Sequence, residues 1–308
     1  MIRHFRRDDD ITPAEQQQII DLAIAMKADP YAHKPLAGPK SIALIFDKTS
    51  TRTRVSFSVG VADLGGNPLI FQAGDSQLGA KESIADTARV LDRLVAAIVW
   101  RTFAQSNIDE MAQHSRVPVI NSLSDAFHPC QLLADLQTIQ EHKGSLAGKT
   151  VAFVGDGSSN MANSYLIAGV MAGMAVRIAT PVSYQPLADA LTTATRIASE
   201  TGGSAQVTAD VAEAVSGADV VVTDTWISMG QEADKERRVA DFAGYSVTDQ
   251  LMSLASSDAI FLHCLPAYRG YEVDAGVIDG PQSAIWDEAE NRLHAQKALM
   301  HFLLTASE

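Results

Sequence analysis

A run of polar side chains follows an apolar segment near the start of the chain. The apolar segment spans residues 41–46, and Asp47-Lys48-Thr49-Ser50-Thr51-Arg52-Thr53-Arg54 comes directly after it. Hydroxyl groups and guanidiniums donate hydrogen bonds to anionic oxygens, and the first N–H groups of a helix do the same. The run therefore predicts a phosphate-like anion site, although it lacks the glycines and the Gly-Lys pair of a Walker loop. The alternative is a capped helix with surface arginines.

A histidine and a glutamine lie three residues apart in the segment Asp-Ala-Phe-His-Pro-Cys-Gln (125–131). At a helix entry, this spacing puts His128 and Gln131 on one face. Histidine can donate to a polarised carbonyl, and glutamine can both donate and accept, as an amide-like substrate requires. Taken alone, however, the segment favours a structural histidine before a proline, and contact with an amide-like substrate is the alternative.

A turn in the second half of the chain resembles a dinucleotide-binding fingerprint. It reads Gly-Asp-Gly-Ser-Ser-Asn (155–160), but Asn160 stands at the third glycine position. The next apolar run ends in Thr180-Pro181, without the acidic residue that would bind a ribose hydroxyl. A small carboxylate is the ligand we expect at this turn, with Asn160 as a contact; a dinucleotide is the alternative.

Two further apolar runs each end in a polar side chain. Asp224 follows residues 220–223, with Ser228 four residues later, and Cys264 comes after residues 259–262. A carboxylate and a hydroxyl at this spacing could hold a primary ammonium, or form a loop and a helix N-cap. Cys264 could be a buried apolar residue, a nucleophile or a polar contact. We expect no metal, because no Cys or His grouping has zinc-ligand spacing, and no Gly-x-Ser-x-Gly elbow supports Ser-His-Asp catalysis.

Buried strands alternating with helices must position these side chains. Continuous apolar runs are typical of strands covered on both faces, and amphipathic stretches lie between most of them, which predicts an α/β fold with mainly parallel sheets flanked by helices. A helix is expected over about 130–142 and ends near Gly144, so we place two domains at 1–143 and 144–287. A last helix at about 288–308 is expected to pack back on the first domain. The expected strands are 41–46, 68–71, 96–100, 117–120, 151–154, 175–179, 220–223 and 259–262.

Composition narrows the class of protein. The 308 residues carry a formal net charge of −13, which argues against broad nucleic-acid binding. The only cysteines, Cys130 and Cys264, indicate a reducing compartment rather than a disulfide framework. No run of about 18 apolar residues predicts a membrane span, and residues 1–10 lack a signal-peptide core, so we expect a cytoplasmic protein.

Taken together, the motifs resemble the carbamoyltransferase family and, within it, the ornithine carbamoyltransferases. The resemblance extends from residue 46 to the last helix, and the Ser-Met-Gly loop with His-Cys-Leu-Pro separates the ornithine enzymes from the aspartate enzymes. The motifs are Ser-Thr-Arg-Thr-Arg (50–54), Gly-Ala-Lys-Glu-Ser-Ile (79–84) before Asp-Thr-Ala-Arg (86–89), His-Pro-Cys-Gln (128–131), Asp-Thr-Trp-Ile-Ser-Met-Gly (224–230), His-Cys-Leu-Pro (263–266) and Glu-Asn-Arg (290–292).

The resemblance implies the transfer of a carbamoyl group from carbamoyl phosphate to the side-chain amine of L-ornithine, giving L-citrulline and phosphate without a covalent enzyme intermediate. It implies no cofactor, a role in arginine biosynthesis and a homotrimer with active sites between subunits. The first domain would bind carbamoyl phosphate and the second ornithine. Two departures are Cys130, where many relatives carry threonine, and Tyr268, which could affect the fit of the acceptor.

The resemblance also implies the role of each site residue. Arg101, His128 and the backbone near Cys264 and Leu265 would polarise the carbonyl, Gln131 would contact the carbamoyl amide, and Cys264 with Asp224 would orient the amine. The expected contacts of carbamoyl phosphate are Ser50, Thr51, Arg52, Thr53, Arg101, His128, Gln131, Cys264, Leu265, Arg292 and, from a neighbouring subunit, Gln77. Those of ornithine are Asn160, Asp224, Ser228 and Met229.

Three alternatives remain open at this stage. Putrescine or an acylated ornithine could be the acceptor, although putrescine lacks the α-carboxylate that Asn160 and the Met229 amide would bind. A metabolite-binding protein without catalysis could share the fold. A nicotinamide-dependent dehydrogenase is disfavoured by Asn160 and Thr180.

Overall fold

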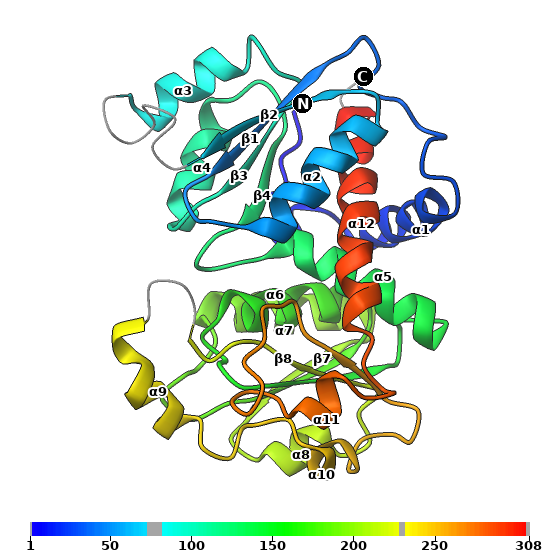
Figure 1. Ribbon diagram of the computed structural model, residues 1–308, viewed down its shortest axis with the longest axis vertical. Helices are drawn as coiled ribbons and strands as arrows, with labels where there is room; N and C mark the ends of the chain where they lie inside the picture. Colours follow the sequence, from blue (N-terminus) through cyan, green and yellow to red (C-terminus); the bar gives the residue numbers. More distant parts are fainter. Residues whose placement is uncertain (1, 73–81, 228–231, 306–308) are drawn as a thin grey trace. The chain divides into compact units, whose positions relative to one another are not determined.

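Two parallel β-sheets, each flanked by helices, organise the chain into two units (Figure 1). The computed structural model describes residues 2–72, 82–227 and 232–305. The first unit comprises Met1–Gln137 with Glu290–Glu308, and the second comprises Thr138–Ala289. Every strand pair in both sheets is parallel, so the predicted fold class is confirmed.

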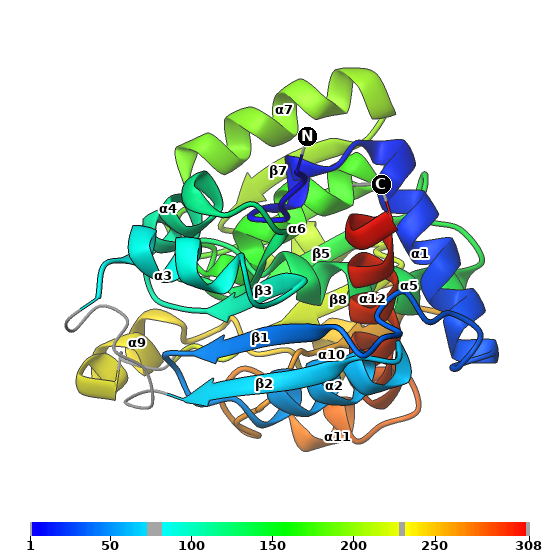
Figure 2. The same cartoon turned by 90° about the horizontal axis from the view of Figure 1, so that it is seen from above.

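The sheet of the first unit has the order β2-β1-β3-β4. Figure 2 shows β1 and β2 running side by side in the same direction. β1, β3 and β4 are buried almost throughout, whereas β2 is a more exposed edge strand. Pro68 fits there, because an edge strand can lack one ladder N–H group. β4 lies at 119–123 rather than at the expected 117–120, because it continues into the buried polar residues Asn121 and Ser122. The strands are β1 (Ser41–Phe46), β2 (Asn67–Gln72), β3 (Ala97–Arg101) and β4 (Val119–Leu123).

Helices cover both faces of this sheet. Trp100 and Ile98 pack with α3 (Ile84–Leu91) and α4 (Gln105–His114) on one face. α1 (Pro13–Ala28), α2 (Thr51–Asp63) and the larger part of α12 (Ile285–Thr305) lie on the other (Figure 1). The 3₁₀-helix η1 (Asp8–Asp10) precedes α1. A capping box begins α1, since Thr12 N–H donates to Glu15 Oε2 at 2.8 Å and Glu15 N–H to Thr12 Oγ1 at 3.3 Å.

A buried lysine fixes α12 to the first unit. Lys297 Nζ donates to Asp63 Oδ2 at 2.9 Å and to the Pro30 carbonyl oxygen at 2.6 Å, and the lysine is fully buried. Gly60 of α2 lets α2 and α12 approach closely, because a Cβ atom there would lie 3.1 Å from Lys297 Cγ. Breaking a buried ion pair typically costs about 3–5 kcal/mol, so this contact is a strong determinant of where α12 packs.

The sheet of the second unit has the order β7-β6-β5-β8-β9. α6 and α7 lie on one face, where Tyr165 contacts Phe153 at 6.0 Å between ring centroids, and α8, α10 and α11 lie on the other (Figure 1). The strands are β5 (Thr150–Val154), β6 (Ala175–Ala179), β7 (Ser204–Thr208), β8 (Val220–Thr223) and β9 (Ile260–Leu262). The helices are α6 (Asn160–Met171), α7 (Ala188–Thr201), α8 (Val211–Val215), η2 (Glu232–Asp234), α9 (Lys235–Asp241), α10 (Asp249–Met252) and α11 (Ala275–Ile278).

The change from one unit to the other falls inside α5 (Pro129–Lys143), between Gln137 and Thr138, whereas we placed the boundary after residue 143. A second change falls inside α12, between Ala289 and Glu290. Continuous helices therefore carry the chain from unit to unit, and no turn or linker composition marks either position.

Each sheet has a point where the strand order reverses. β1 lies between β2 and β3, and β5 lies between β6 and β8. Ligands of open α/β sheets bind beyond the carboxyl ends of the strands at such a point. The polar segments after β1 and β3, and those after β5 and β8, are therefore where a site is expected in each unit.

Candidate active site

The polar run after β1 forms the first turn of α2. Ser50 is the N-cap, and its hydroxyl accepts a hydrogen bond from Thr53 N–H at 3.3 Å. Thr51, Arg52 and Thr53 are the first three residues of the helix. A helix therefore follows the apolar run, and its positive end lies at the carboxyl end of β1.

Three arginines from separate elements surround Thr53 and His128, and we call these five residues the basic cluster. Thr53 is fully buried, and its hydroxyl accepts from Arg292 Nη2 at 2.7 Å and from Arg101 Nη1 at 3.5 Å. Arg52 comes from α2, Arg101 ends β3 and Arg292 lies on α12. Guanidiniums that share one hydroxyl acceptor repel one another, so the cluster concentrates positive charge at one point.

The basic cluster determines the protonation of His128. Burial lowers the pKa of His128 well below its ordinary value, and the nearby charges of Arg292, Arg101 and Arg52 lower it further. His128 is therefore neutral at pH 7, and one ring nitrogen carries a proton that it can donate in a hydrogen bond.

Gln131 is the third residue of α5, and a buried carboxylate fixes its orientation. Its Nε2 donates to Asp135 Oδ1 at 2.8 Å, and both side chains are fully buried. Since the nitrogen is directed to Asp135, the amide oxygen is the end that is oriented to accept. Asp135 was not among the predicted site residues, because its spacing from Gln131 resembles any helical pair.

Sequence reasoning also missed Lys48, which links three loops of the first unit. Its ammonium forms an ion pair with Asp125 and lies 4.5 Å from the centre of the Phe103 ring. Asp125 N–H donates to the Phe103 carbonyl oxygen at 2.7 Å. The loops after β1, β3 and β4, which carry or border the basic cluster, are thereby held together. Only its place inside the polar run could have drawn attention to Lys48.

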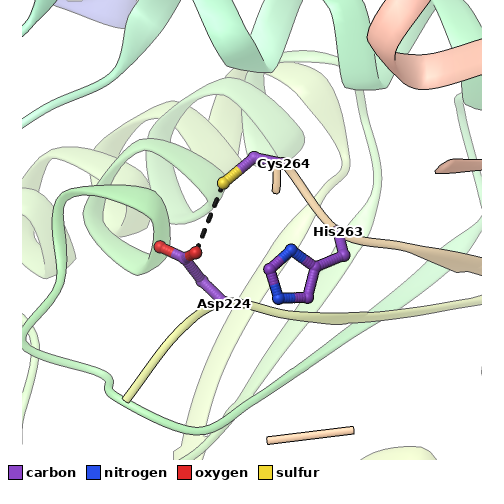
Figure 3. Close-up of side chains that lie close together, drawn as sticks. All are labelled: Asp224, His263 and Cys264. Atoms are coloured by element: carbon purple, nitrogen blue, oxygen red, sulfur yellow. Dashed lines mark hydrogen bonds between the residues drawn. The ribbon is translucent and has the colours of Figure 1, made fainter. Parts of the chain in front are cut away.

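In the second unit, Asp224 directly follows β8 and meets Cys264, which follows β9 (Figure 3). Cys264 Sγ donates to Asp224 Oδ1 at 3.3 Å, and Thr225 N–H donates to the same oxygen at 2.7 Å. Burial raises the pKa of the Asp224 carboxyl above its ordinary value, because desolvation disfavours the charged form. A positively charged partner would stabilise the charged form of such a desolvated carboxylate.

His263 supports the same loop. Its Nδ1 accepts from Leu265 N–H at 2.9 Å, and its Nε2 lies 3.3 Å from Glu272 Oε1. The bond helps to hold Leu265 at a φ of 57°, which non-glycine residues rarely adopt. Asp224, His263 and Cys264 bring donor atoms within 4.8 Å of one another, as a metal site would. Both ring nitrogens of His263 are engaged, however, so this arrangement favours a supporting role for the histidine.

The turn after β5 leads directly into α6. Ser159 is the N-cap and accepts from Ala162 N–H at 3.2 Å, and Asn160 begins the helix. Thr180 is fully buried, and its hydroxyl accepts from Gly157 N–H at 2.9 Å. A buried threonine that holds the turn thus occupies the place where a dinucleotide site needs an exposed acidic residue.

The predicted site residues divide between the two units. Of the described residues, Ser50, Thr51, Arg52, Thr53, Arg101, His128, Gln131 and Arg292 belong to the first unit, and Asn160, Asp224, Cys264 and Leu265 to the second. Three more predicted residues, Gln77, Ser228 and Met229, lie outside the described residues. No helix among those described is long and apolar enough to cross a membrane.

The fold and the motifs define a class of two-domain carbamoyl-transferring enzymes, and sequence profiles of that class match most of the chain. The "Aspartate/ornithine carbamoyltransferase, carbamoyl-P binding domain" matches residues 3–141, and the "Aspartate/ornithine carbamoyltransferase, Asp/Orn binding domain" matches residues 147–303. The chain belongs to the aspartate/ornithine carbamoyltransferase family.

Proteins similar to this chain include ornithine carbamoyltransferases from several organisms. The enzyme of Clavibacter sepedonicus is 63% identical over 307 residues, which cover 100% of both chains. The solved structure of ornithine carbamoyltransferase from Pyrococcus furiosus has a TM-score of 0.92 at 46% identity, covering 96% of this chain and 95% of that one. The anabolic ornithine carbamoyltransferase of Campylobacter jejuni has a TM-score of 0.94 at 39% identity, covering 99% and 100%. The resemblance inferred from the motifs is confirmed.

Proposed function

We propose that the chain is an ornithine carbamoyltransferase. It transfers the carbamoyl group of carbamoyl phosphate to the side-chain amine of L-ornithine and releases L-citrulline and phosphate. The observation that carries most weight is the basic cluster, where three guanidiniums and the start of α2 converge beyond the carboxyl ends of β1 and β3. The 63% identity to a named ornithine carbamoyltransferase supports the choice of acceptor.

The donor would bind at the basic cluster. Phosphate oxygens would accept from the hydroxyls and N–H groups of Ser50, Thr51 and Thr53 and from Arg52 and Arg101, with Arg292 adding charge. Such preorganised donors also stabilise negative charge that develops during the reaction.

The carbamoyl group would lie against α5. Neutral His128 would donate to the carbonyl oxygen, together with Arg101 and the backbone near Cys264 and Leu265, which would polarise the carbon. The oriented oxygen of Gln131 would accept from the carbamoyl NH₂ group.

The acceptor would bind in the second unit. The raised pKa of Asp224 favours a positively charged partner, and the α-amino group of ornithine supplies one. Asn160 at the start of α6 would hold the α-carboxylate, together with Ser228 and the Met229 backbone. Cys264, which bonds to Asp224, would orient the side-chain amine.

The chemical step needs no covalent enzyme intermediate, because the acyl–phosphate bond is already reactive. The side-chain ammonium, with a pKa of about 10.4 in water, must first lose a proton. The nitrogen lone pair then attacks the carbonyl carbon, and the bond from carbon to the phosphate oxygen breaks. Phosphate leaves with that electron pair and can accept a proton from the amine. The protein contributes position and charge stabilisation.

We further propose a cytoplasmic homotrimer that serves arginine biosynthesis, with Gln77 of each subunit reaching a neighbour's site. The family resemblance supports this part of the proposal. Light scattering on the purified protein would test it, since a mass near that of one 32.9 kDa chain would exclude the trimer.

The first experiment is an acceptor comparison. Carbamoyl transfer from carbamoyl phosphate is measured with ornithine, N-acetylornithine, putrescine and aspartate in parallel. A strong preference for ornithine is expected. Preference for another acceptor would refute the acceptor while keeping the transfer chemistry, and no transfer to any of the four would refute the enzymatic function.

A further inference from the structure

A buried ion pair in the second unit joins the turn after β5 to α9. Arg238 is 5% exposed and Asp156 is 3% exposed. The Arg238 Nη2 donates to Asp156 Oδ2, and its Nε donates to the carbonyl oxygen of Trp226. One side chain of α9 therefore connects the segments that follow β5 and β8, the two strands beside the reversal of strand order.

Aromatic rings enclose the guanidinium. The Arg238 Cζ lies 4.9 Å from the centre of the Tyr184 ring and 5.4 Å from that of Phe242. Trp226 stacks on Phe242 with 5.6 Å between centroids. Cation–π contacts strengthen when they are desolvated, and only arginine can use two N–H groups in one plane. A lysine would have to serve both acceptors from a single nitrogen, without the planar fork of the guanidinium.

The Asp156 carboxylate shapes the turn that leads to Asn160. Its Oδ1 accepts from Ser158 N–H at 2.9 Å and from Ser158 Oγ at 2.6 Å, and its Oδ2 accepts from Arg238. Ser159 then caps α6, and Asn160 follows. A negative charge so close to a helix start opposes any anionic ligand there, and Arg238 neutralises it.

We propose that Arg238 is a positioning residue for the α-carboxylate of the acceptor. It acts through Asp156, by holding the turn and cancelling a charge that would repel the carboxylate beside Asn160. The inference rests on the proposed function, and it identifies the ion pair as a determinant of specificity for amino-acid acceptors over simple amines.

The test compares variants at saturating carbamoyl phosphate. Arg238→Met should raise the KM for ornithine about 10-fold or more, equivalent to ~1.4 kcal/mol, and leave the KM for carbamoyl phosphate within about twofold. Asp156→Asn combined with Arg238→Met should recover part of the loss, because no uncompensated charge remains. Arg237→Met is the matched control, since Arg237 lies on the same helix with its side chain 64% exposed, and its kinetics should not change.

A second readout separates positioning from general damage. Inhibition by 2-aminopentanoate, which keeps the α-amino and α-carboxylate groups, should weaken in Arg238→Met by the same factor as the ornithine KM rises. Inhibition by pentylamine, which lacks the carboxylate, should not change. If Arg238→Met does not fold, Arg238→Lys serves in its place, with the same expected direction and a smaller shift.

Four results would overturn the inference. The first is an ornithine KM that stays within about twofold of the unmodified protein's in Arg238→Met, and the second is a double variant no better than Arg238→Met. The third is a parallel rise in the KM for carbamoyl phosphate. The fourth is pentylamine inhibition weakened as much as that by 2-aminopentanoate in Arg238→Met or, if that variant does not fold, in Arg238→Lys. Failure of the unmodified protein to carbamoylate ornithine would instead refute the proposed function, so the two failures are distinguishable.

Discussion

Replacing Asp224 by asparagine should weaken binding of the acceptor without destabilising the fold. Asparagine has nearly the same shape and can still accept the hydrogen bond from Thr225 N–H, which is 2.7 Å in the structure. What it removes is the negative charge that we assign to the ammonium of ornithine. A charge-assisted hydrogen bond contributes about 1.5–3 kcal/mol, so the KM for ornithine should rise roughly 10- to 150-fold.

The same substitution should not destabilise the free protein. Because burial raises the pKa of Asp224, the folded state binds more protons than the unfolded state between pH 3.8 and the raised value. Stability therefore falls as pH rises through that window, and at pH 7 an ionised Asp224 opposes folding. Asparagine cannot ionise, so the unfolding midpoint of Asp224→Asn should equal or exceed that of the unmodified protein.

The assay combines steady-state kinetics for both substrates with thermal unfolding followed by circular dichroism. Glu200→Gln is the matched control, because it removes one negative charge from an exposed position of the same unit, where the side chain is 62% accessible. The reasoning is refuted if Asp224→Asn weakens both substrates equally, or if its midpoint falls by several degrees while the control is unchanged.

Three further predictions concern the basic cluster. Arg52→Ala should remove roughly 2 to 4 kcal/mol of transition-state stabilisation, measured as kcat/KM for carbamoyl phosphate, and near-normal turnover would exclude Arg52 from the site. Thr53→Val deprives Arg292 of its 2.7 Å acceptor, so urea unfolding should show a loss of about 1.5–3 kcal/mol together with a higher KM for carbamoyl phosphate; unchanged stability would contradict the buried bond. Because the pKa of His128 is lowered in the folded state, below pH 6.5 the unfolded state binds a proton there that the folded state does not bind. The free energy of unfolding should therefore fall as the pH falls. His128→Gln should reduce that slope, and an identical slope would show that His128 is not the neutral, desolvated group described.

The sequence was most informative where strands are covered on both faces. β1, β3, β5 and β8 are continuous apolar runs, and each was located to within a residue or so. β7 (Ser204–Thr208) was missed, because an edge strand pairs on one side only and its sequence Ser-Ala-Gln-Val-Thr is largely polar. The changes of unit inside α5 and α12 leave no signal either, since a helix that continues between units keeps ordinary helical composition.

The residues of the candidate site also differ in how readily the sequence alone identifies them. Ser50 to Thr53 were identified because a cluster of donors after a buried strand is unusual in itself. Arg238 was not, because its neighbours Lys235, Glu236 and Arg237 give α9 the composition of a solvated surface helix. Its burial depends on rings and a carboxylate far away in sequence, which periodicity does not predict.

The contact between Lys297 and Asp63 affects the order in which the molecule can be completed during synthesis. Asp63 and the β1–β4 sheet are made early, but their buried cation comes from a helix translated after the whole second unit. At about 5–20 residues per second, the roughly 150 intervening residues take about 8–30 s. For that time the nascent first unit exposes the surface that α12 will cover, with an unneutralised carboxylate beside it. The second unit is contiguous in sequence, so no other unit is translated between its first and last residues.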